Sequence, residues 1–402
     1  MLSNKQKRIY CDHASGTPVD REVLNIMKPY FIEHFHNPGS IYKEGVEVST
    51  IINQSRIQVA HILKARPEEI IFVDGATEAN NIAIFGLVKK WRTEHPGKVP
   101  HIITTQIEHA SVLETCYALE EEGAVVTYLS VNKDGYINQK ELKDVLTENT
   151  VVVSIGYVNG EIGTIQDIKE IMKIIRHYRK YNKSQYPYMH TDAVQAVNYI
   201  DEIGTPQLGI DLMTLNASKI YGPKKIAILF IKTGVNINPI LFGGNQEKGL
   251  RSGTENVPYI VGMAGSLILA RKLQASESLR LRKLQKYTQE CLRKLFPKLI
   301  INAEAADIIP NIVNISFPKL SHEEIVIRLD AKGIMSSVKS ACKAGEDGDS
   351  HVIKAIRKGD NTGSIRFSFG RLTTKKDIDY LLRVLKDIVE AMNKTQKDYY
   401  LQ

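Results

Sequence analysis

EIIFV (69–73), GATEANNIAIFGLVKKW (75–91) and HIITT (101–105) decide the fold class of this 402-residue chain. Short β-branched runs alternate there with longer amphipathic segments, and the alternation continues through TVVVSIGYV (150–158) to IAILFIK (226–232). Strand, helix, strand in this rhythm predicts a mostly parallel sheet that is covered by helices on both faces. Because ligands of such sheets bind beyond the carboxyl ends of the strands, we expect functional residues directly after the strands.

The second half of the chain has a different texture. Long charged helices are predicted after Pro258, with short strands near NIVNISF (311–317) and SIRFSFG (364–370) and a final helix from Lys375 to Lys394. This pattern is typical of a smaller α+β domain. We therefore predict a large α/β domain at 16–257 and a small α+β domain that combines 1–15 with 258–402.

The composition is that of an ordinary globular protein, with 43% hydrophobic and 24% charged residues. No run approaches the roughly 18 apolar residues of a membrane span, and no apolar stretch follows the basic N-terminus, so we expect a cytoplasmic protein without membrane contact. The net charge of +8 is spread among acidic residues, which argues against direct nucleic-acid binding. A basic surface also suits an acidic protein partner or a phosphorylated cofactor.

The four cysteines, Cys11, Cys116, Cys291 and Cys342, include no CxxC pair. This spacing argues against a disulfide framework and against a metal site. Three of them lie in apolar surroundings and are interpreted as packing residues. Cys342 instead opens the polar stretch CKAGEDGDSH (342–351), which has the composition of a surface loop, and the lysine beside it favours the thiolate. A buried packing role is the alternative for any single cysteine.

Four chemically distinctive positions follow predicted strands. The Gly-Ala-Thr segment at 75–77 opens a helix, where backbone N–H groups can bind a phosphate, although an ordinary helix N-cap has the same pattern. His109 and Asp192 also follow strands, and their alternatives are a structural histidine and an N-cap carboxylate. Lys219 lies between an apolar strand and a Gly-Pro turn, which suits Schiff-base chemistry unless it is a solvated turn lysine. A phosphate cradle, an imidazole, a carboxylate and a lysine together are what pyridoxal 5'-phosphate (PLP) requires of a protein.

A series of longer motifs carries a family resemblance. In chain order they are YCDHASGTPVD, NPGSIY, FVDGATEANN, IEHASV, VNGEIGTIQDI, HTDAVQA, SKIYGPKK, RSGTEN, SSVKSAC and SIRFSFGRLTT. With these motifs, almost the whole chain resembles the cysteine desulfurases, which are fold-type I PLP enzymes of the class V aminotransferase family. The resemblance implies an α/β fold, with a large domain built on a mostly parallel seven-stranded sheet and a smaller α+β C-terminal domain that carries the catalytic cysteine.

The resemblance also implies how the cofactor is held. Lys219 would carry PLP, and Asp192 would pair with the pyridine nitrogen. Gln195 would bind the ring hydroxyl. His109 would stack on the ring and assist proton transfer, so His109 and Lys219 are implied catalytic residues. Further cofactor contacts are implied for Ala76, Thr77, Asn159, Asn216 and Ser218, and for Thr254 from the second subunit of a homodimer.

Substrate and partner follow from the same resemblance. Arg366, Asn159 and Asn37 would bind L-cysteine, with the planar guanidinium of Arg366 clamping the carboxylate. Cys342 would be the catalytic nucleophile that takes the sulfur as a persulfide and leaves L-alanine. A sulfur-acceptor protein, either an iron–sulfur scaffold or a sulfur carrier, would then use the sulfur for iron–sulfur cluster assembly or tRNA thiolation.

The chain departs from the family pattern at several positions. Gly160 and His13 each stand where the family usually has asparagine, and Ser218 and Phe242 each stand where it usually has histidine. Asn216 replaces the usual serine, and Asn245 replaces the usual glycine. Two alternatives stay open beside a cysteine desulfurase. One is another class V enzyme, such as a selenocysteine lyase or an aminotransferase. The other is a homologue without catalysis that serves as a binding partner or scaffold.

Overall fold

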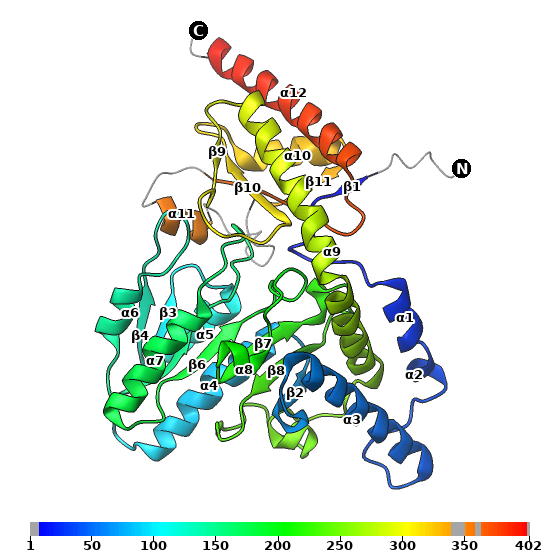
Figure 1. Ribbon diagram of the computed structural model, residues 1–402, viewed down its shortest axis with the longest axis vertical. Coiled ribbons are helices and arrows are strands. Elements are labelled where there is room, and N and C mark those ends of the chain that lie inside the picture. The colour runs from blue at the N-terminus through cyan, green and yellow to red at the C-terminus, as the bar shows by residue number, and fades with distance from the viewer. Residues whose placement is uncertain (1–7, 339–349, 358–362, 400–402) are drawn as a thin grey trace.

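The computed structural model describes residues 8–338, 350–357 and 363–399. Its largest feature is a seven-stranded sheet in the order β2-β8-β7-β6-β5-β3-β4 (Figure 1). The strands are β2 (Ile70–Val73), β3 (His101–Thr105), β4 (Val125–Leu129), β5 (Thr150–Ser154), β6 (Tyr188–Asp192), β7 (Leu212–Asn216) and β8 (Ala227–Ile231). Only β8 is antiparallel to its neighbours in this sheet. The predicted α/β fold with a mostly parallel seven-stranded sheet is confirmed.

Both faces of this sheet are buried. Along β2, Ile70 and Phe72 belong to one hydrophobic core, while Ile71 and Val73 belong to another on the opposite face. The first face is covered by α3 (Lys43–Leu63), α7 (Ile168–Asn182) and the start of α9 (Val257–Leu295), and the second by α4 (Ala76–Glu94) and α5 (Ala110–Glu121). A strand that is buried on both faces is a continuous β-branched run, which is why the sequence pattern predicted these strands.

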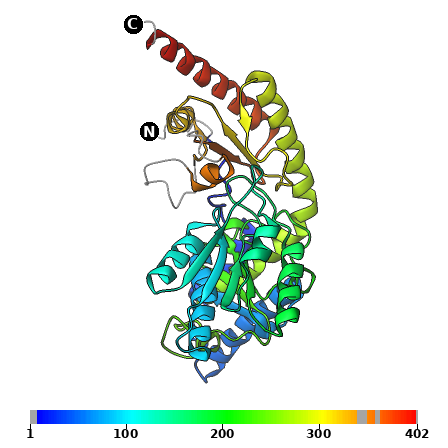
Figure 2. The same cartoon turned by 90° about the vertical axis from the view of Figure 1, so that its left-hand side faces the viewer.

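A smaller sheet lies above the large one in Figures 1 and 2. It is antiparallel and has the order β12-β10-β9, beside a separate parallel pair of β1 and β11. Its elements are β1 (Ile9–Tyr10), β9 (Ile300–Ile301), β10 (Ile312–Ser316), β11 (Ile334–Met335), β12 (Ile365–Ser368), α10 (His322–Ala331), α11 (His351–Arg357) and α12 (Lys375–Tyr399). Cys11, Phe367 and Leu385 are among the residues of a separate core here, so the N-terminal strand packs with the C-terminal part of the chain.

The helix α9 joins the two parts. Ile260 and Leu267 near its start pack into the core of the large sheet, and Leu281 and Leu292 pack into the core of the small one. The charged segment after Pro258, predicted as several long helices, is one continuous helix of 39 residues. The packing of α9 into both cores does not test where one domain ends and the next begins. The predicted domains, 16–257 and 1–15 with 258–402, therefore stay a prediction.

The remaining elements lie around these layers. They are α1 (Arg21–Met27), α2 (Pro29–Ile32), α6 (Gln139–Val145), α8 (Thr205–Leu208) and the 3₁₀ helices η1 (Pro67–Glu69), η2 (Ala217–Lys219) and η3 (Gln246–Gly249). Within the described ranges, every helix is too short or too polar to cross a membrane. The strands β2, β3, β5, β6 and β7 end at the same edge of the sheet, so the loops that follow them meet there.

Candidate active site

A cavity of about 230 Å³ opens where these strand ends meet the small sheet. Its lining includes these predicted site residues: Ala76, Thr77, His109, Asn159, Asp192, Gln195, Asn216, Lys219 and Arg366. Ser218, Thr254 and Asn37 do not line it, and the side chains of Thr254 and Asn37 are exposed. Cys342 lies outside the described residues. The structure therefore brings most of the predicted set together, and the roles assigned to these residues stay predictions.

The N-terminus of α4 forms one wall of the cavity. Gly75 is the N-cap and has no side chain that could cap the helix, so the first N–H groups are not bonded within the helix. Ala76 and Thr77 of the first turn line the cavity, and a Cβ added at Gly75 would meet no atom within 4 Å. Open space beside uncapped N–H groups at the positive end of a 19-residue helix is suited to an anion such as phosphate.

Asp192, at the end of β6, is held by a polar network. One carboxylate oxygen accepts a hydrogen bond from Val194 N (3.0 Å), and the other accepts from Asn80 Nδ2 (2.9 Å). The same Asn80 amide donates to Ser111 Oγ (2.8 Å), and Ser111 Oγ lies 2.9 Å from His109 Nδ1. A helix residue thus links the carboxylate to the imidazole, and the two side chains are oriented as one unit.

His109 is the N-cap of α5 as well as a lining residue. Its Nδ1 accepts a hydrogen bond from Ser111 N at 3.1 Å. In the neutral imidazole the proton is therefore on Nε2. Both interpretations of this residue, as a structural cap and as a site residue, are compatible with its position.

The N-terminal segment closes the cavity beside Lys219. Lys219 follows β7 in η2, and its Nζ donates to Ser15 O. Gln195 Nε2 donates to Ala14 O at 2.9 Å. An Asn198 side chain donates to Lys219 O at 2.7 Å and fixes the backbone that carries the amine. Two residues far from the sheet in sequence therefore complete the lining.

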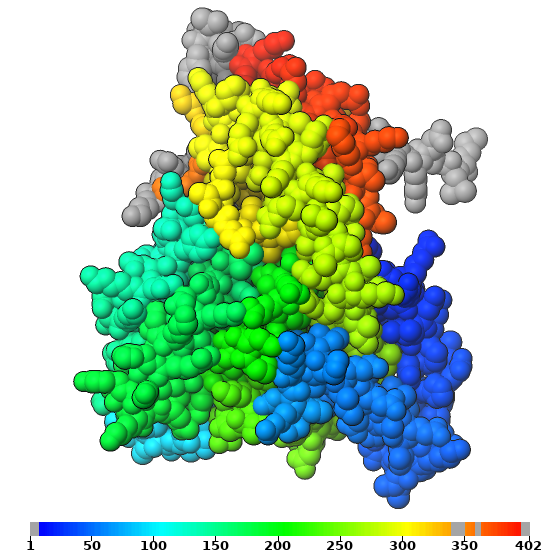
Figure 3. Space-filling model, viewed as in Figure 1, coloured from blue at the N-terminus to red at the C-terminus, as the bar shows by residue number. Residues whose placement is uncertain are grey.

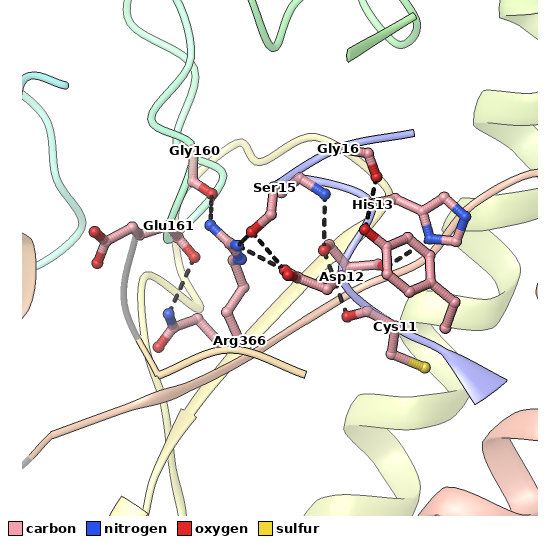
Figure 4. A network of polar contacts seen from close by, with 12 residues as sticks. Cys11, Asp12, His13, Ser15, Gly16, Gly160, Glu161 and Arg366 are labelled. Carbon is pink, nitrogen blue, oxygen red and sulfur yellow. Dashed lines mark hydrogen bonds and ion pairs between the residues drawn. The ribbon is translucent and has the colours of Figure 1, made fainter. Parts of the chain in front are cut away.

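Arg366 of β12 enters the cavity from the small sheet, as Figure 4 shows. Its side chain is 4% exposed, and it forms an ion pair with Asp12 at 2.7 Å. Its Nη2 also donates to Ser15 Oγ (2.7 Å) and its Nη1 to Gly160 O (2.9 Å). Among the described residues, none accepts a hydrogen bond from the buried Nε–H. A guanidinium that is fixed on one side and keeps an unused donor is suited to an incoming carboxylate.

Gly160 and Ser218 are two of the positions where the chain departs from the family pattern. The contacts described above do not depend on the side chains at these positions. Arg366 binds the backbone carbonyl of residue 160, which any residue would supply. A Cβ at Gly160 would lie 3.4 Å from Gln195 Nε2, so glycine leaves extra space beside that amide. The backbone oxygen of Ser218 accepts a hydrogen bond from Thr17 N, and the Ser218 side chain does not line the cavity.

Sequence reasoning missed several polar residues in or beside the site, among them Asp12, Ser15, Glu108, Glu161 and His351. Glu108 is the most unusual. Burial raises the pKa of its carboxyl to about 7, although hydrogen bonds from Gly156 N and Thr105 Oγ1 act in the opposite direction. In the sequence, Glu108 is an acidic residue shortly after a predicted strand. The sequence alone does not tell whether such a residue is buried in a site or exposed in a loop. The polar stretch predicted to end at His351 also ends earlier, because Ser350 is buried and His351 begins α11.

Comparison with known proteins identifies the family of this chain. Residues 9–381 match the class V aminotransferase family. The chain is 40% identical over 389 residues to the cysteine desulfurase IscS of Dictyoglomus turgidum, an alignment that covers 96% of each protein. This chain belongs to the cysteine desulfurases of the class V aminotransferase family.

Solved structures of similar proteins share the fold. A NifS-like protein superposes with a TM-score of 0.87 at 32% identity, covering 96% of this chain and all of that one. SspA in complex with cysteine superposes with a TM-score of 0.75 at 30% identity, covering 90% of this chain and 99% of that one. The family that the motifs predicted is confirmed.

The side chains of this cysteine desulfurase family member fit PLP. The uncapped turn of α4 is suited to the phosphate, the carboxylate of Asp192 to a protonated ring nitrogen, and the amine of Lys219 to the aldehyde. All three open into one cavity. The chemistry of this donor set is therefore that of a PLP site.

Proposed function

We propose that this protein is a PLP-dependent cysteine desulfurase that converts L-cysteine to L-alanine and takes the sulfur as a persulfide on Cys342. The observation that carries the proposal is the single cavity in which Lys219, Asp192, His109 and Arg366 meet, in a chain of this family. Arg366 supports an amino-acid substrate, because its buried Nε–H finds no acceptor in the described part of the chain and a carboxylate would provide one.

Cofactor binding would use residues from three strand ends. Thr77 and the first turn of α4 would hold the phosphate, Asp192 the ring nitrogen and Gln195 the ring hydroxyl. Bound PLP supplies an electron sink for the pair that remains on Cα when its proton is removed. Ala76, Asn159 and Asn216 line the same wall and would complete the pocket.

The protein's own groups would then carry the protons and the substrate. The amine of Lys219 removes the Cα proton, and its contact with Ser15 O holds it at the cavity wall. His109 donates from Nε2, since its Nδ1 is occupied by Ser111 N. Arg366 holds the substrate carboxylate, which fixes which substituents of Cα face the amine.

Sulfur transfer is the step that needs a nucleophile. The thiolate of Cys342 attacks the substrate sulfur, an S–S bond forms, and the C–S bond breaks with its electron pair remaining on carbon. Protonation of that carbon gives L-alanine. Of the described cysteines, Cys11 and Cys116 cannot take this role, because burial raises the pKa of each thiol to about 12. The persulfide sulfur would pass to an acceptor protein, an iron–sulfur scaffold or a sulfur carrier for tRNA thiolation.

A homodimer would complete the site. Thr254 does not line the cavity of its own chain, and the family resemblance implies that it comes from a second subunit. An exposed apolar surface supports the dimer: Leu24, Ile26, Phe31, Ile32, Phe35, Ile41, Tyr42 and Val46, which we call the α1–α3 patch. An apolar surface of this extent is typical of a protein–protein contact.

The deciding experiment compares products. Purified protein is loaded with PLP and given L-cysteine and a reductant, and L-alanine and sulfide are measured together in wild type, Cys342→Ser and Cys291→Ser. We expect equal yields of both products in wild type and Cys291→Ser, and none in Cys342→Ser. Bound PLP without either product would show that another amino acid is the substrate, and failure to bind PLP would support a non-catalytic homologue.

A further inference from the structure

His351 is a titratable cavity residue that the mechanism above does not use. It is the first residue of α11, and it lines the cavity together with Lys219 and Arg366. Its Nε2 lies 2.9 Å from the backbone oxygen of Glu108. Because a carbonyl oxygen only accepts hydrogen bonds, Nε2 carries a proton, and Nδ1 of the neutral imidazole offers a lone pair.

Two pairs of consecutive residues connect this imidazole to other residues of the cavity wall. Arg366 donates to Gly160 O, and the next residue, Glu161, accepts a hydrogen bond from Ser350, which precedes His351 (Figure 4 shows the Gly160, Glu161 and Arg366 part). On the other side, Glu108 O binds His351, and the residue after Glu108 is His109. His351 is thus linked through neighbouring residues to both Arg366 and His109, and all three line the cavity.

Two carboxylates of the cavity wall already accept hydrogen bonds from other residues. The Glu108 carboxylate accepts hydrogen bonds from Gly156 N and Thr105 Oγ1, and Asp192 accepts from Val194 N and Asn80. Arg366 would hold the carboxylate of an amino-acid substrate, and its amine would lie near Lys219. Another residue of the cavity then has to recognise the substrate side chain. In its neutral form the imidazole of His351 offers an acceptor on the same cavity wall.

We propose that His351 determines the specificity of this site, by accepting a hydrogen bond at Nδ1 from the neutral thiol of L-cysteine and disfavouring the ionised selenol of L-selenocysteine. The inference rests on the proposed function. A cysteine thiol, with a pKa near 8.5, keeps its proton at neutral pH and can donate it. A selenol is the stronger acid and is ionised there, so its selenium can only accept. Nδ1 of the neutral His351 and an ionised selenium are both acceptors, so neither receives a hydrogen bond from the other. Binding of L-selenocysteine therefore costs free energy that binding of L-cysteine does not.

Two variants separate the two nitrogens of the ring. Glutamine at position 351 keeps a donor near the place of Nε2 for Glu108 O but has no acceptor near the place of Nδ1. Asparagine keeps an acceptor near Nδ1 and loses the donor. His177→Gln, an exposed histidine on α7, is the matched control. Each PLP-loaded protein is assayed for L-alanine release from L-cysteine and L-selenocysteine, and the inhibition constant of L-alanine, which has no thiol, is measured in parallel.

In His351→Gln we expect the ratio of kcat/KM for L-cysteine over that for L-selenocysteine to fall about tenfold. His351→Asn should stay within about threefold of wild type in this ratio, and neither variant should change the inhibition by L-alanine. An unchanged ratio in His351→Gln, or an equal fall in both variants, would overturn the specificity role while leaving the desulfurase intact. Wild type that releases no L-alanine from L-cysteine overturns the proposed function, and the inference with it.

Discussion

At the scale of single residues, Arg366 makes the sharpest demand on side-chain geometry. Its planar guanidinium donates to Asp12, Ser15 and Gly160, and within residues 8–338, 350–357 and 363–399 nothing accepts from its Nε–H. Lysine would keep the charge and lose the fork. We expect Arg366→Lys to raise KM for L-cysteine about 10- to 100-fold, because a charged hydrogen bond to the carboxylate is lost. Steady-state kinetics beside Arg293→Lys, an exposed arginine of α9, tests this, and a KM within threefold of wild type would refute the clamp.

Glu108 gives the protein a pH-dependent stability. Burial raises its folded pKa to about 7 from an ordinary value of 4.5, so between these values the folded state binds a proton that the unfolded state has lost. The contribution is full below pH 4.5 and is lost as pH rises through 7. Its upper bound is about 3 kcal/mol.

Glu108→Gln cannot ionise and should lack this pH dependence. We expect the free energy of unfolding of wild type to fall, relative to that of the variant, as pH rises from 5 to 8. Urea unfolding at several pH values measures the difference, with Glu121→Gln on the exposed face of α5 as control. Parallel curves for wild type and Glu108→Gln would show that the carboxyl ionises normally.

The site residues that sequence reasoning missed were not predictable for one shared physical reason. Lys219, Asp192 and His109 could be predicted because each follows its own strand, so local sequence gives both the residue type and its place. Asp12 and Arg366 are 354 positions apart, and their ion pair depends on how the small sheet packs. Glu108 and His351 likewise meet across 243 positions. No local pattern encodes such contacts.

At the scale of elements, α4 connects the two ends of the cofactor site. Its uncapped first turn faces the cavity, and one turn later Asn80 binds Asp192. A single rigid helix therefore sets the distance between the proposed phosphate and ring-nitrogen sites.

The hydroxyl of Thr77 should contribute one hydrogen bond to the phosphate. We expect Thr77→Val to weaken PLP binding at least tenfold, since hydrogen bonds to charged groups are among the stronger ones. Titration of the cofactor-free protein, followed by the absorbance of bound PLP, measures this. Thr93→Val near the end of the same helix, where the hydroxyl donates to Lys89 O, is the control. Equal affinities of all three proteins would place the phosphate elsewhere.

The elements themselves were predictable to different degrees. The strands of the large sheet followed from β-branched runs, because burial on both faces leaves no polar alternation to obscure them. The reversed direction of β8 and the strand order did not follow, since both depend on pairings between distant segments. The single helix α9 was predicted as several helices because its charged C-terminal half has no buried stripe as wide as that of its first half.

At the scale of the whole molecule, the N-terminal strand belongs with the C-terminal sheet. The pairing of β1 with β11 carries Asp12 and Ser15 to Arg366 and Lys219, so folding of the small sheet completes the cavity of the large one. The cytoplasmic location and the sulfur acceptor stay predictions, because neither follows from the arrangement of the chain.

The α1–α3 patch gives the proposed homodimer a test. The exposed fractions of its side chains reach 98% at Ile41, 78% at Ile32 and 68% at Phe35, and these segments form the blue lower-right part of the surface in Figure 3. Burial of apolar side chains stabilises a contact by about 25 cal/mol per Å², so a charge in the patch should oppose association. Wild type should sediment with twice the 45.2 kDa mass of one chain.

We expect Ile41→Glu to sediment as a single chain at micromolar concentration and to bind PLP more weakly, because Thr254 of the partner subunit would be absent from the phosphate. Ile327→Glu is the matched control, since Ile327 is 69% exposed on α10, in the other part of the molecule. It should stay dimeric with wild-type PLP affinity. A dimeric Ile41→Glu would move the interface away from the patch, and a monomer with undiminished PLP affinity would show that each chain builds its cofactor site alone.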